Sequence, residues 1–447
     1  MQPIKKELIL INPPVSNYLI RFATNLVHGV YVPVSLHILA ALTPKDYKVR
    51  FIYRTFFWRK KDFTPGTLVG ITCVTSSAPH AYRIAERYRK AGAFVVMGGP
   101  HVSVLPEEAL GHCHSVVVGE AESVWPQVIR DFENGSLQRI YRGTPLDDFF
   151  SPVYEYFLRL PPQELRRTGI LMQKGCKYHC DFCSIPSVKL RFVKIEQVVE
   201  LAKRATQGRF LGALRRPTIT LVGDNLFSSP PYAKDLFRAL RPVRIRWVTV
   251  SSIDIAFDDE ALVLARKGGC RLLLIGFESI HPRQFAKTSV HQMSSVKDYA
   301  RAIRRIKSRG IAVFGSFIAG FDNYTHGDYF RMLCFLAKPM RFLFVNVTVL
   351  TPFPGCAIRE QFLKEGRIKK AGWGAYTMIR VLYRPRHMSA RSLQLWLLVM
   401  KITAACMSQL GLSLTVCMLS VYSFFLTSDV LERLGSYLAA LFFVTYH

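Results

Sequence analysis

Three cysteines stand close together in the stretch KGCKYHCDFCSIP, which runs from residue 174 to residue 186. Cys176, Cys180 and Cys183 follow the spacing C-x3-C-x2-C, in a loop that comes directly after a strand-like apolar run. Clustered thiolates are metal ligands, and two kinds of metal site compete for this pattern. A structural zinc ion would need a fourth Cys or His, and the adjacent His179 cannot easily fold back onto the same ion. An iron–sulfur cluster with one iron left open to chelate a substrate or cofactor explains why no fourth cysteine stands nearby.

The aromatic Phe182 precedes the last of these cysteines, and strand–helix repeats follow it. With these features the region resembles the radical S-adenosylmethionine (SAM) superfamily. The resemblance implies that Cys176, Cys180 and Cys183 hold a 4Fe-4S cluster. It also implies that the reduced cluster passes an electron into bound SAM, which then yields a radical that abstracts hydrogen. The competing interpretation is that the three cysteines are coincidental or bind zinc.

Polar residues end several of the predicted strands after the cysteines. The resemblance assigns LVGDNLF to the SAM amino group, VSSIDIA and GFESI to its ribose or carboxylate, and GSFIAGFDN to its adenine. Each segment alone also fits an ordinary barrel strand with a polar end. Their order after the cysteines supports the assignment. The implied cofactor-binding residues are Phe182, Gly223, Asp224, Asn225, Ser252, Glu278, Gly315 and Gly320.

The chain before the cysteines carries a second candidate binding edge. From Leu8 to about Gln138, short β-branched runs alternate with helical patterns, which predicts a parallel sheet with helices on both faces. The strand ends supply hydroxyls, glycines that let a ligand approach the backbone, and a carboxylate. These residues are Thr75, Ser76, Ser77, Gly98, Gly99 and Glu120. A dinucleotide would use the same edge, but no G-x-G-x-x-G motif follows the first strand.

Residues 68–135 resemble the cobalamin-binding domain that precedes the barrel in one branch of the radical SAM superfamily. The resemblance implies that cobalamin contacts Thr75, Ser76, Gly98, Gly99 and Glu120. The motif D-x-H-x-x-G, by which other cobalamin proteins supply a histidine to cobalt, does not occur. The resemblance therefore implies a cobalt whose lower face is not held by histidine. We interpret the histidine at position 101 as a loop residue with local hydrogen bonds.

The predicted fold class is α/β, in four parts. A Rossmann-like cobalamin-binding domain occupies residues 1–140, and a linker rich in Pro, Asp and aromatic residues occupies 141–165. A radical SAM partial (β/α) barrel follows over 166–365. A helical C-terminal extension completes the chain over 366–447.

Composition limits the partners and the compartment. The chain has 447 residues, half of them hydrophobic, and a net charge of +29 that favours polyanions without selecting one. Its ten cysteines are mostly scattered, and no secretory signal is evident, so we expect a cytoplasmic protein. Residues 402–428 carry no charge and are long enough to span a bilayer. Helices that dock on the barrel or lie in a membrane interface fit this tail as well as a true span does.

By pattern, the chain resembles hopanoid C-methylases and the anaerobic magnesium-protoporphyrin ester cyclase over roughly residues 5–390. The resemblance implies a cobalamin-dependent methyltransferase acting on an unactivated carbon of a hydrophobic, lipid-like substrate. It further implies a reducing partner such as flavodoxin or ferredoxin, and the charge and apolar tail favour action at a membrane surface. A protein that has lost catalysis and only binds at the membrane is disfavoured by the intact cysteines.

Two enzymatic alternatives stay open. A cobalamin-using radical cyclase or oxidoreductase would have the same domains and motifs. A tRNA methylthiotransferase-like enzyme is suggested by the charge alone. That class carries a second three-cysteine cluster in its N-terminal domain, where this chain has only Cys73 and Cys113. Nucleic acid is therefore not the expected partner.

Overall fold

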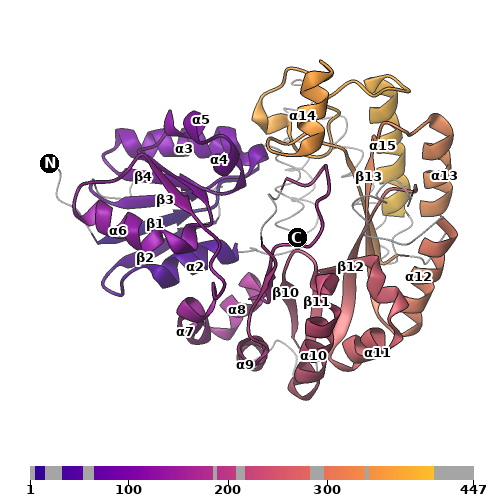
Figure 1. The fold of residues 1–447 in the computed structure, drawn as a ribbon, viewed down its shortest axis with the longest axis horizontal. Helices are drawn as coiled ribbons and strands as arrows, with labels where there is room; N and C mark the ends of the chain where they lie inside the picture. Colours follow the sequence, from indigo (N-terminus) through magenta and orange to yellow (C-terminus); the bar gives the residue numbers. More distant parts are fainter. Residues whose placement is uncertain are drawn as a thin grey trace, which may run out of the picture.

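The structure is a computed structural model that describes residues 6–15, 33–53, 65–184, 189–207, 217–281, 296–337 and 342–406. Two parallel sheets with helices packed on them stand side by side, the N-terminal one on the left in Figure 1. The predicted α/β fold class is confirmed.

The N-terminal sheet has six strands in the order β2-β1-β3-β4-β5-β6, and every pairing in it is parallel. Its strands are β1 (Glu7–Ile11), β2 (Lys48–Ile52), β3 (Leu68–Thr72), β4 (Phe94–Gly98), β5 (Ser115–Gly119) and β6 (Ile140–Gly143). Its helices are α2 (Val34–Leu42), α3 (Ala78–Lys90), α4 (Pro100–Val104), α5 (Pro106–Leu110) and α6 (Trp125–Glu133).

Each face of this sheet has its own buried core. In β1, Ile9 and Ile11 pack in one cluster with residues of α3, α4 and α5, whereas Leu8 and Leu10 pack in the other with α2 and α6. Successive side chains of a strand point to opposite faces, so a continuous apolar strand such as ELILI serves both cores. This explains why the strand reads as an apolar run rather than an alternating one.

The second sheet also has six strands, in the order β14-β13-β12-β11-β10-β7, and all are parallel. They are β7 (Ile170–Leu171), β10 (Thr218–Val222), β11 (Arg246–Ser251), β12 (Cys270–Glu278), β13 (Ala312–Ala319) and β14 (Phe344–Val349). Helices α9 (Ile195–Thr206), α10 (Pro230–Leu240), α11 (Asp259–Lys267), α12 (Val296–Ser308) and α13 (His326–Leu336) alternate with the strands and line the outer face of the curved sheet (Figure 1). This is the predicted partial barrel.

Local sequence explains these helices. In α12 the buried residues Tyr299, Ala302, Ile303 and Ile306 recur at three- and four-residue intervals, which places them on the one face that packs on the sheet. A capping box between Thr325 and Asp328 begins α13 by satisfying backbone N–H groups of its first turn.

The range predicted as a linker is more ordered than its composition suggested. Strand β6 enters it, and it contains helices α7 (Ser151–Arg159) and α8 (Pro162–Thr168). Both helices carry proline in the first turn, where its missing N–H costs no helical hydrogen bond. The prolines therefore mark the beginnings of helices rather than breaks between domains.

After β14 the chain forms α14 (Ala357–Lys364), a 3-10 turn η7 (Trp373–Ala375) and α15 (Ala390–Cys406). Helix α15 packs on β14 and α13. The predicted charge-free tail of 402–428 lies almost wholly outside the described residues. Within the described ranges, none of the helices is both long and apolar enough to cross a membrane.

Candidate active site

The three cysteines lie on one loop whose two ends pair with each other. The loop leaves strand β8 (Gln173–Lys174) and returns into strand β9 (Arg191–Phe192), and these two strands form an antiparallel pair. Cys176 and Cys180 are partly buried, and Cys183 is exposed. The backbone N–H of Cys183 donates to the carbonyl of Cys180 at 2.9 Å.

The environment of Cys180 suits a metal-held thiolate. Burial, together with the nearby charges of Cys183, Glu278 and Cys176, raises the pKa of the Cys180 thiol to about 12. A thiol in such a place ionises only when a bound metal supplies compensating positive charge. Within the described ranges, no three His, Cys, Asp or Glu side chains form a group that could hold a single metal ion.

The end of β10 supports the cysteine loop. The Asp224 carboxylate accepts a hydrogen bond of 2.7 Å from the backbone N–H of Gly175, the residue before Cys176. Gly223 packs against Gln173, and a Cβ at position 223 would lie 3.1 Å from the Gln173 side chain. The predicted residues Gly223 and Asp224 are thus next to the loop, where they shape its first turn.

Asn225 links two of the predicted strand ends. Its side-chain oxygen accepts from the backbone N–H of Phe227 at 3.2 Å and from that of Ser252 at 2.8 Å. Among the described residues, Ser252 Oγ and Gln173 Oε1 are buried oxygens without a hydrogen-bond partner. Buried polar atoms are rarely left unpaired, so unpaired oxygens beside the cysteine loop fit a bound polar ligand.

Glu278 ends β12 in a strained conformation. Its φ is 58°, in the left-handed region that a non-glycine residue seldom adopts, and the pairing register with β13 shifts at this point. Burial raises the pKa of the Glu278 carboxyl to about 7. Its carboxylate folds back over Gly276, where an added Cβ would lie 2.2 Å from Glu278 Oε1. Strain of this kind concentrates at ligand sites.

The other predicted SAM residues pack against aromatic rings. A Cβ at Gly315 would lie 2.6 Å from the Phe342 ring, and Gly320 has a φ of 103° and accepts a hydrogen bond from the Tyr383 hydroxyl. Phe182 meets Phe321 edge to face, with ring centroids 6.0 Å apart. The two glycines, Gly315 and Gly320, therefore have a packing role in the barrel wall.

The candidate cobalamin residues gather at the carboxyl edge of the N-terminal sheet. Gly99 has a φ of 102°, and a Cβ there would lie 2.9 Å from the backbone of Cys73. Thr75 and Ser76 lie on the 3-10 turn η1 (Thr75–Ser77), which follows β3. Gly98 is the last residue of β4, and its carbonyl accepts from the Cys73 N–H at 2.8 Å. The end of β4 therefore packs closely against the backbone after β3, and a side chain at position 99 would clash there.

His101 lies on α4 rather than in a loop. Its Nδ1 is 3.3 Å from the Thr75 hydroxyl and its Nε2 is 3.1 Å from the Tyr82 hydroxyl. Burial lowers the pKa of this imidazole. The ring is thus held by local hydrogen bonds, as expected for a histidine that does not bind cobalt.

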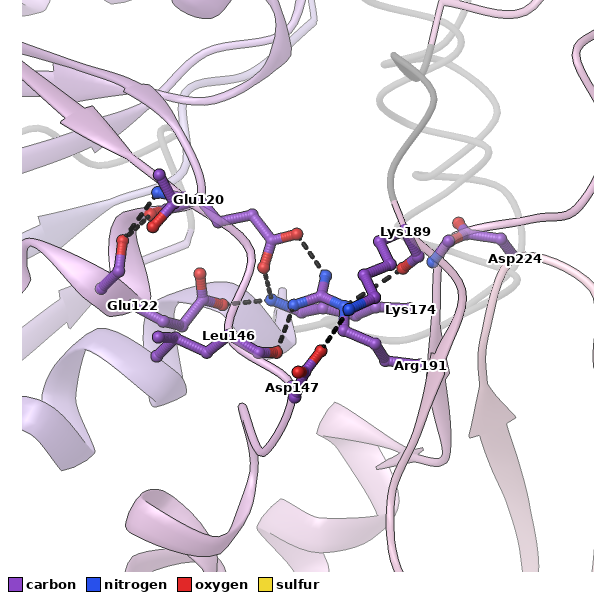
Figure 2. Close-up of polar contacts among 11 residues, drawn as sticks. Glu120, Glu122, Leu146, Asp147, Lys174, Lys189, Arg191 and Asp224 are labelled. Atoms are coloured by element: carbon purple, nitrogen blue, oxygen red, sulfur yellow. Dashed lines mark hydrogen bonds and ion pairs between the residues drawn. The ribbon is translucent and has the colours of Figure 1, made fainter.

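Glu120 differs from the other predicted cobalamin residues, because its carboxylate is turned toward the barrel. Figure 2 shows it beside Arg191 and Lys174, with Glu122 on the other side of the lysine. The sequence did not predict this group, because Glu122 lies 52 residues before its partner Lys174 and Glu120 lies 71 residues before its partner Arg191. Only the position of Lys174 just before the cysteine loop could have drawn attention to it.

The C-terminal extension also reaches helices α4 and α5 of the N-terminal domain, which the sequence did not predict. Trp373 Nε1 donates to Glu108 Oε1 at 2.7 Å, and the Trp373 ring meets His101 edge to face at 5.2 Å. On the barrel side, the Arg359 guanidinium lies 5.4 Å from the centroid of the Trp373 ring. This tryptophan therefore joins the extension to the edge that carries Thr75.

The two cysteines of the N-terminal domain are buried and hydrogen-bonded to backbone. Cys73 Sγ lies 3.7 Å from the carbonyl of Val74, and Cys113 Sγ lies 3.2 Å from that of Ala109. Burial raises the pKa of each thiol to about 12. They are core residues in separate places and do not form the second cysteine cluster of a methylthiotransferase.

Comparison with known proteins agrees with this geometry. The model of the radical SAM superfamily matches residues 170–336, and that of the B12 binding domain matches residues 22–129. Bacteriochlorophyllide d C-12(1)-methyltransferase of Chlorobaculum tepidum is 30% identical over 82% of this chain and 80% of its own length. Bacteriochlorophyllide d C-8(2)-methyltransferase of the same organism is 25% identical over 78% of this chain and 80% of its own length.

A solved structure supports the fold. The radical SAM methyltransferase TsrM of Kitasatospora setae, with cobalamin and a 4Fe-4S cluster bound, superposes with a TM-score of 0.62 at 18% identity, covering 82% of this chain and 76% of that one. The two relatives expected from the sequence patterns are also found. Hopanoid C-2 methylase of Rhodopseudomonas palustris is 23% identical over 75% of this chain and 65% of its own length. Anaerobic magnesium-protoporphyrin IX monomethyl ester cyclase of Rubrivivax gelatinosus is 22% identical over 64% of this chain and 57% of its own length.

The matched domains account for all three predicted cofactors: the 4Fe-4S cluster and SAM for the barrel, and cobalamin for the N-terminal domain. The chain belongs to the radical SAM superfamily, as an enzyme of its cobalamin-binding methyltransferase branch.

Proposed function

We propose that this enzyme transfers a methyl group to an unactivated carbon of a large hydrophobic ring system of the bacteriochlorophyllide type. The observation that carries the proposal is the 30% identity to bacteriochlorophyllide d C-12(1)-methyltransferase, which extends over most of both chains. A second relative with 25% identity is named for the same ring system. The net charge of +29 suits a substrate or surface that carries negative charge.

In this proposal Cys176, Cys180 and Cys183 hold the 4Fe-4S cluster. When bound, the cluster and SAM supply a hydrogen-abstracting radical, and cobalamin supplies the methyl group. Asp224 fixes the loop through the Gly175 N–H, so the three thiolates are presented from a defined backbone. The partial burial of Cys176 and Cys180 limits the access of bulk water to these two thiolates, whereas Cys183 is exposed.

The polar strand ends would bind SAM. Ser252 Oγ and Gln173 Oε1 are buried oxygens that a polar ligand would satisfy. Glu278 would contact the ribose or the carboxylate of SAM, and its raised pKa lets it hold a proton near neutral pH. Gly223, Asn225, Gly315, Gly320 and Phe182 would complete the pocket walls, as predicted from the sequence.

The N-terminal edge would hold cobalamin. In this proposal Gly98 and Gly99, which carry no side chains, let a bulky ring or its nucleotide tail approach the backbone, and Thr75 and Ser76 on turn η1 add hydroxyl contacts. Since the ring nitrogens of His101 face Thr75 and Tyr82, no residue of α4 is proposed as a cobalt ligand. The proposal includes a flavodoxin or ferredoxin as the electron donor and a membrane surface as the place of action.

The test is incubation of the anaerobically reconstituted enzyme with SAM, cobalamin, a reductant and bacteriochlorophyllide d, followed by mass spectrometry. We expect one added methyl group per turnover on a ring substituent, and no product from a Cys183→Ala variant. If the substrate gains no methyl group but forms a new ring or loses hydrogen, the result would instead support the cyclase or oxidoreductase alternative. If no tetrapyrrole is changed but another apolar molecule is methylated, the proposed substrate class is wrong.

A further inference from the structure

The base of the cysteine loop places two positive charges opposite each other. In the antiparallel pair of β8 and β9, Lys174 is directly across from Arg191. Directly opposed residues of an antiparallel pair project to the same face, and like charges in that position destabilise the pairing. With only two residues in each strand, the pair has little other ladder to hold it. The loop that carries the cysteines therefore needs an external source of negative charge at its base.

Two carboxylates of the cobalamin-binding domain supply that charge. Glu120 follows β5, and Glu122 lies on the next 3-10 turn, η2 (Ala121–Ser123). Glu122 forms an ion pair with Lys174, and Glu120 forms one with Arg191 (Figure 2). Glu120 also lies 3.7 Å from the Lys174 ammonium, so it contacts both cations. Two positive and two negative charges from different domains thus form one neutral group.

This group is shielded from water, unlike a typical surface ion pair. The side-chain exposure is 4% for Arg191, 8% for Glu122, 14% for Glu120 and 21% for Lys174. Arg191 is further fixed by its Nη1, which donates to the carbonyl of Leu146 at 2.6 Å. Removing one member of a buried group of this kind is costly, because it leaves a charge without its partner.

The connecting segment between the domains packs under the same group. The Phe149 ring is fully buried and has the Lys174 ammonium and the Arg191 guanidinium each 5.1 Å from its centroid. Cation–π contacts at a buried ring add to the attraction. The two cations are thus held by the ring and by carboxylates from the neighbouring domain at once.

We infer that Glu120 and Glu122 are positioning residues that hold the base of the cysteine loop against the cobalamin-binding domain. This role differs from the cobalamin contact predicted for Glu120 from the sequence, and it rests on the proposed assignment of the loop as the cluster loop. Through the hairpin, the two carboxylates set where the loop stands relative to the edge that carries Gly98 and Gly99. The pairing of β8 with β9 then depends on the docking of the cobalamin-binding domain against the barrel.

The test measures hydrogen–deuterium exchange of peptides covering 175–184 in the full-length protein. In an E120Q/E122Q variant, we expect exchange of these peptides to become about tenfold faster, while peptides of β3 and β4 keep their rates. The matched control is Glu260→Gln, which removes an exposed carboxylate from its pairs with Lys234 and Arg238. That variant should leave the loop unchanged.

A charge exchange separates an ionic role from a packing role. K174E alone places three carboxylates around Arg191 and should speed exchange of the loop, whereas E122K/K174E restores two charges of each sign and should recover most of the protection. Unchanged exchange in a folded E120Q/E122Q protein, or no recovery in E122K/K174E, would overturn the inference. If the double variant does not fold, Glu122→Gln is measured in the same way with the same criterion.

Iron analysis of the same samples keeps this inference separate from the proposed function. If the unchanged protein binds no iron, the assignment of the loop as the cluster loop is wrong. The hydrogen–deuterium exchange rates would still decide whether Glu120 and Glu122 hold β8 and β9 together. Iron bound normally in the unchanged protein, together with unaltered exchange in the variants, would refute only the positioning role.

Discussion

At the scale of single residues, the chemistry of the site depends on groups whose surroundings alter their ordinary behaviour. Cys180 and Glu278 are examples, because burial raises the pKa of both. The spacing of the cysteines predicted metal binding from the sequence alone. The positive φ of Glu278 could not be predicted, because it results from a register shift between β12 and β13 that only the paired strands reveal.

Another residue whose environment matters is His37 on α2, which lies buried between two tyrosines. Its Nδ1 is 3.1 Å from the Tyr156 hydroxyl of α7, and its Nε2 is 3.5 Å from the Tyr53 hydroxyl. Burial lowers the pKa of His37 to about 4. Because the unfolded chain takes up this proton near pH 6.5 and the folded chain does not, stability is lost as the pH falls from about 6.5 toward 4.

We therefore expect His37 to contribute about 2 kcal/mol to the loss of stability between pH 7 and pH 5. A His37→Gln variant should show a correspondingly smaller difference between urea unfolding at the two pH values. His387→Gln, at an exposed position, serves as the control. An unchanged pH dependence in His37→Gln would show that the histidine is not buried in its neutral form.

At the scale of elements, the strand ends of the barrel support the cysteine loop. Tyr178 of the loop donates to Asp254 on the turn after β11 at 3.1 Å, and the Ile358 N–H of α14 donates to the Asp181 carbonyl at 3.0 Å. The strands themselves were predictable, since runs such as TITLVGDN have β-branched residues followed by a polar end. These cross-contacts were not, because they join segments that are distant in the sequence.

The contact between Asp224 and Gly175 gives a prediction at this scale. Asp224→Ala leaves the Gly175 N–H without its partner, which costs about 1–3 kcal/mol in a partly buried place and loosens the loop. We expect iron content after anaerobic reconstitution to fall severalfold. Asp224→Asn keeps a side-chain carbonyl as acceptor and should retain most of the iron. Equal loss in both variants would mean that the negative charge, and not the hydrogen bond, is what the loop requires.

At the scale of the whole molecule, the two domains are joined by more than one contact. The carboxylates Glu120 and Glu122 reach the barrel at the base of the cysteine loop, and Trp373 of the C-terminal extension reaches the N-terminal domain at Glu108. The sequence predicted the domains and their order. It did not predict how they dock, because an ion pair or an indole hydrogen bond across domains leaves no periodic signal in the chain.

Removing the tryptophan should weaken this docking. Trp373→Ala loses the hydrogen bond to Glu108 and the cation–π contact with Arg359, which together are worth about 1–2 kcal/mol. We expect urea unfolding to begin at lower denaturant and to separate into two steps, since the domains then unfold more independently. Phe330→Ala, which removes an exposed aromatic ring on α13, should leave a single transition in place. Identical curves for both variants would argue against a docking role for Trp373.

The central claim is that one chain holds an iron–sulfur cluster on three cysteines and cobalamin on a separate domain. Its most direct test is iron and cobalt analysis of protein purified anaerobically from cobalamin-fed cells, beside a variant with Cys176, Cys180 and Cys183 all changed to alanine. We predict about four irons and about one cobalt per chain, with only the iron lost in the variant. Zinc in place of iron, or iron that survives loss of the three cysteines, would contradict the account.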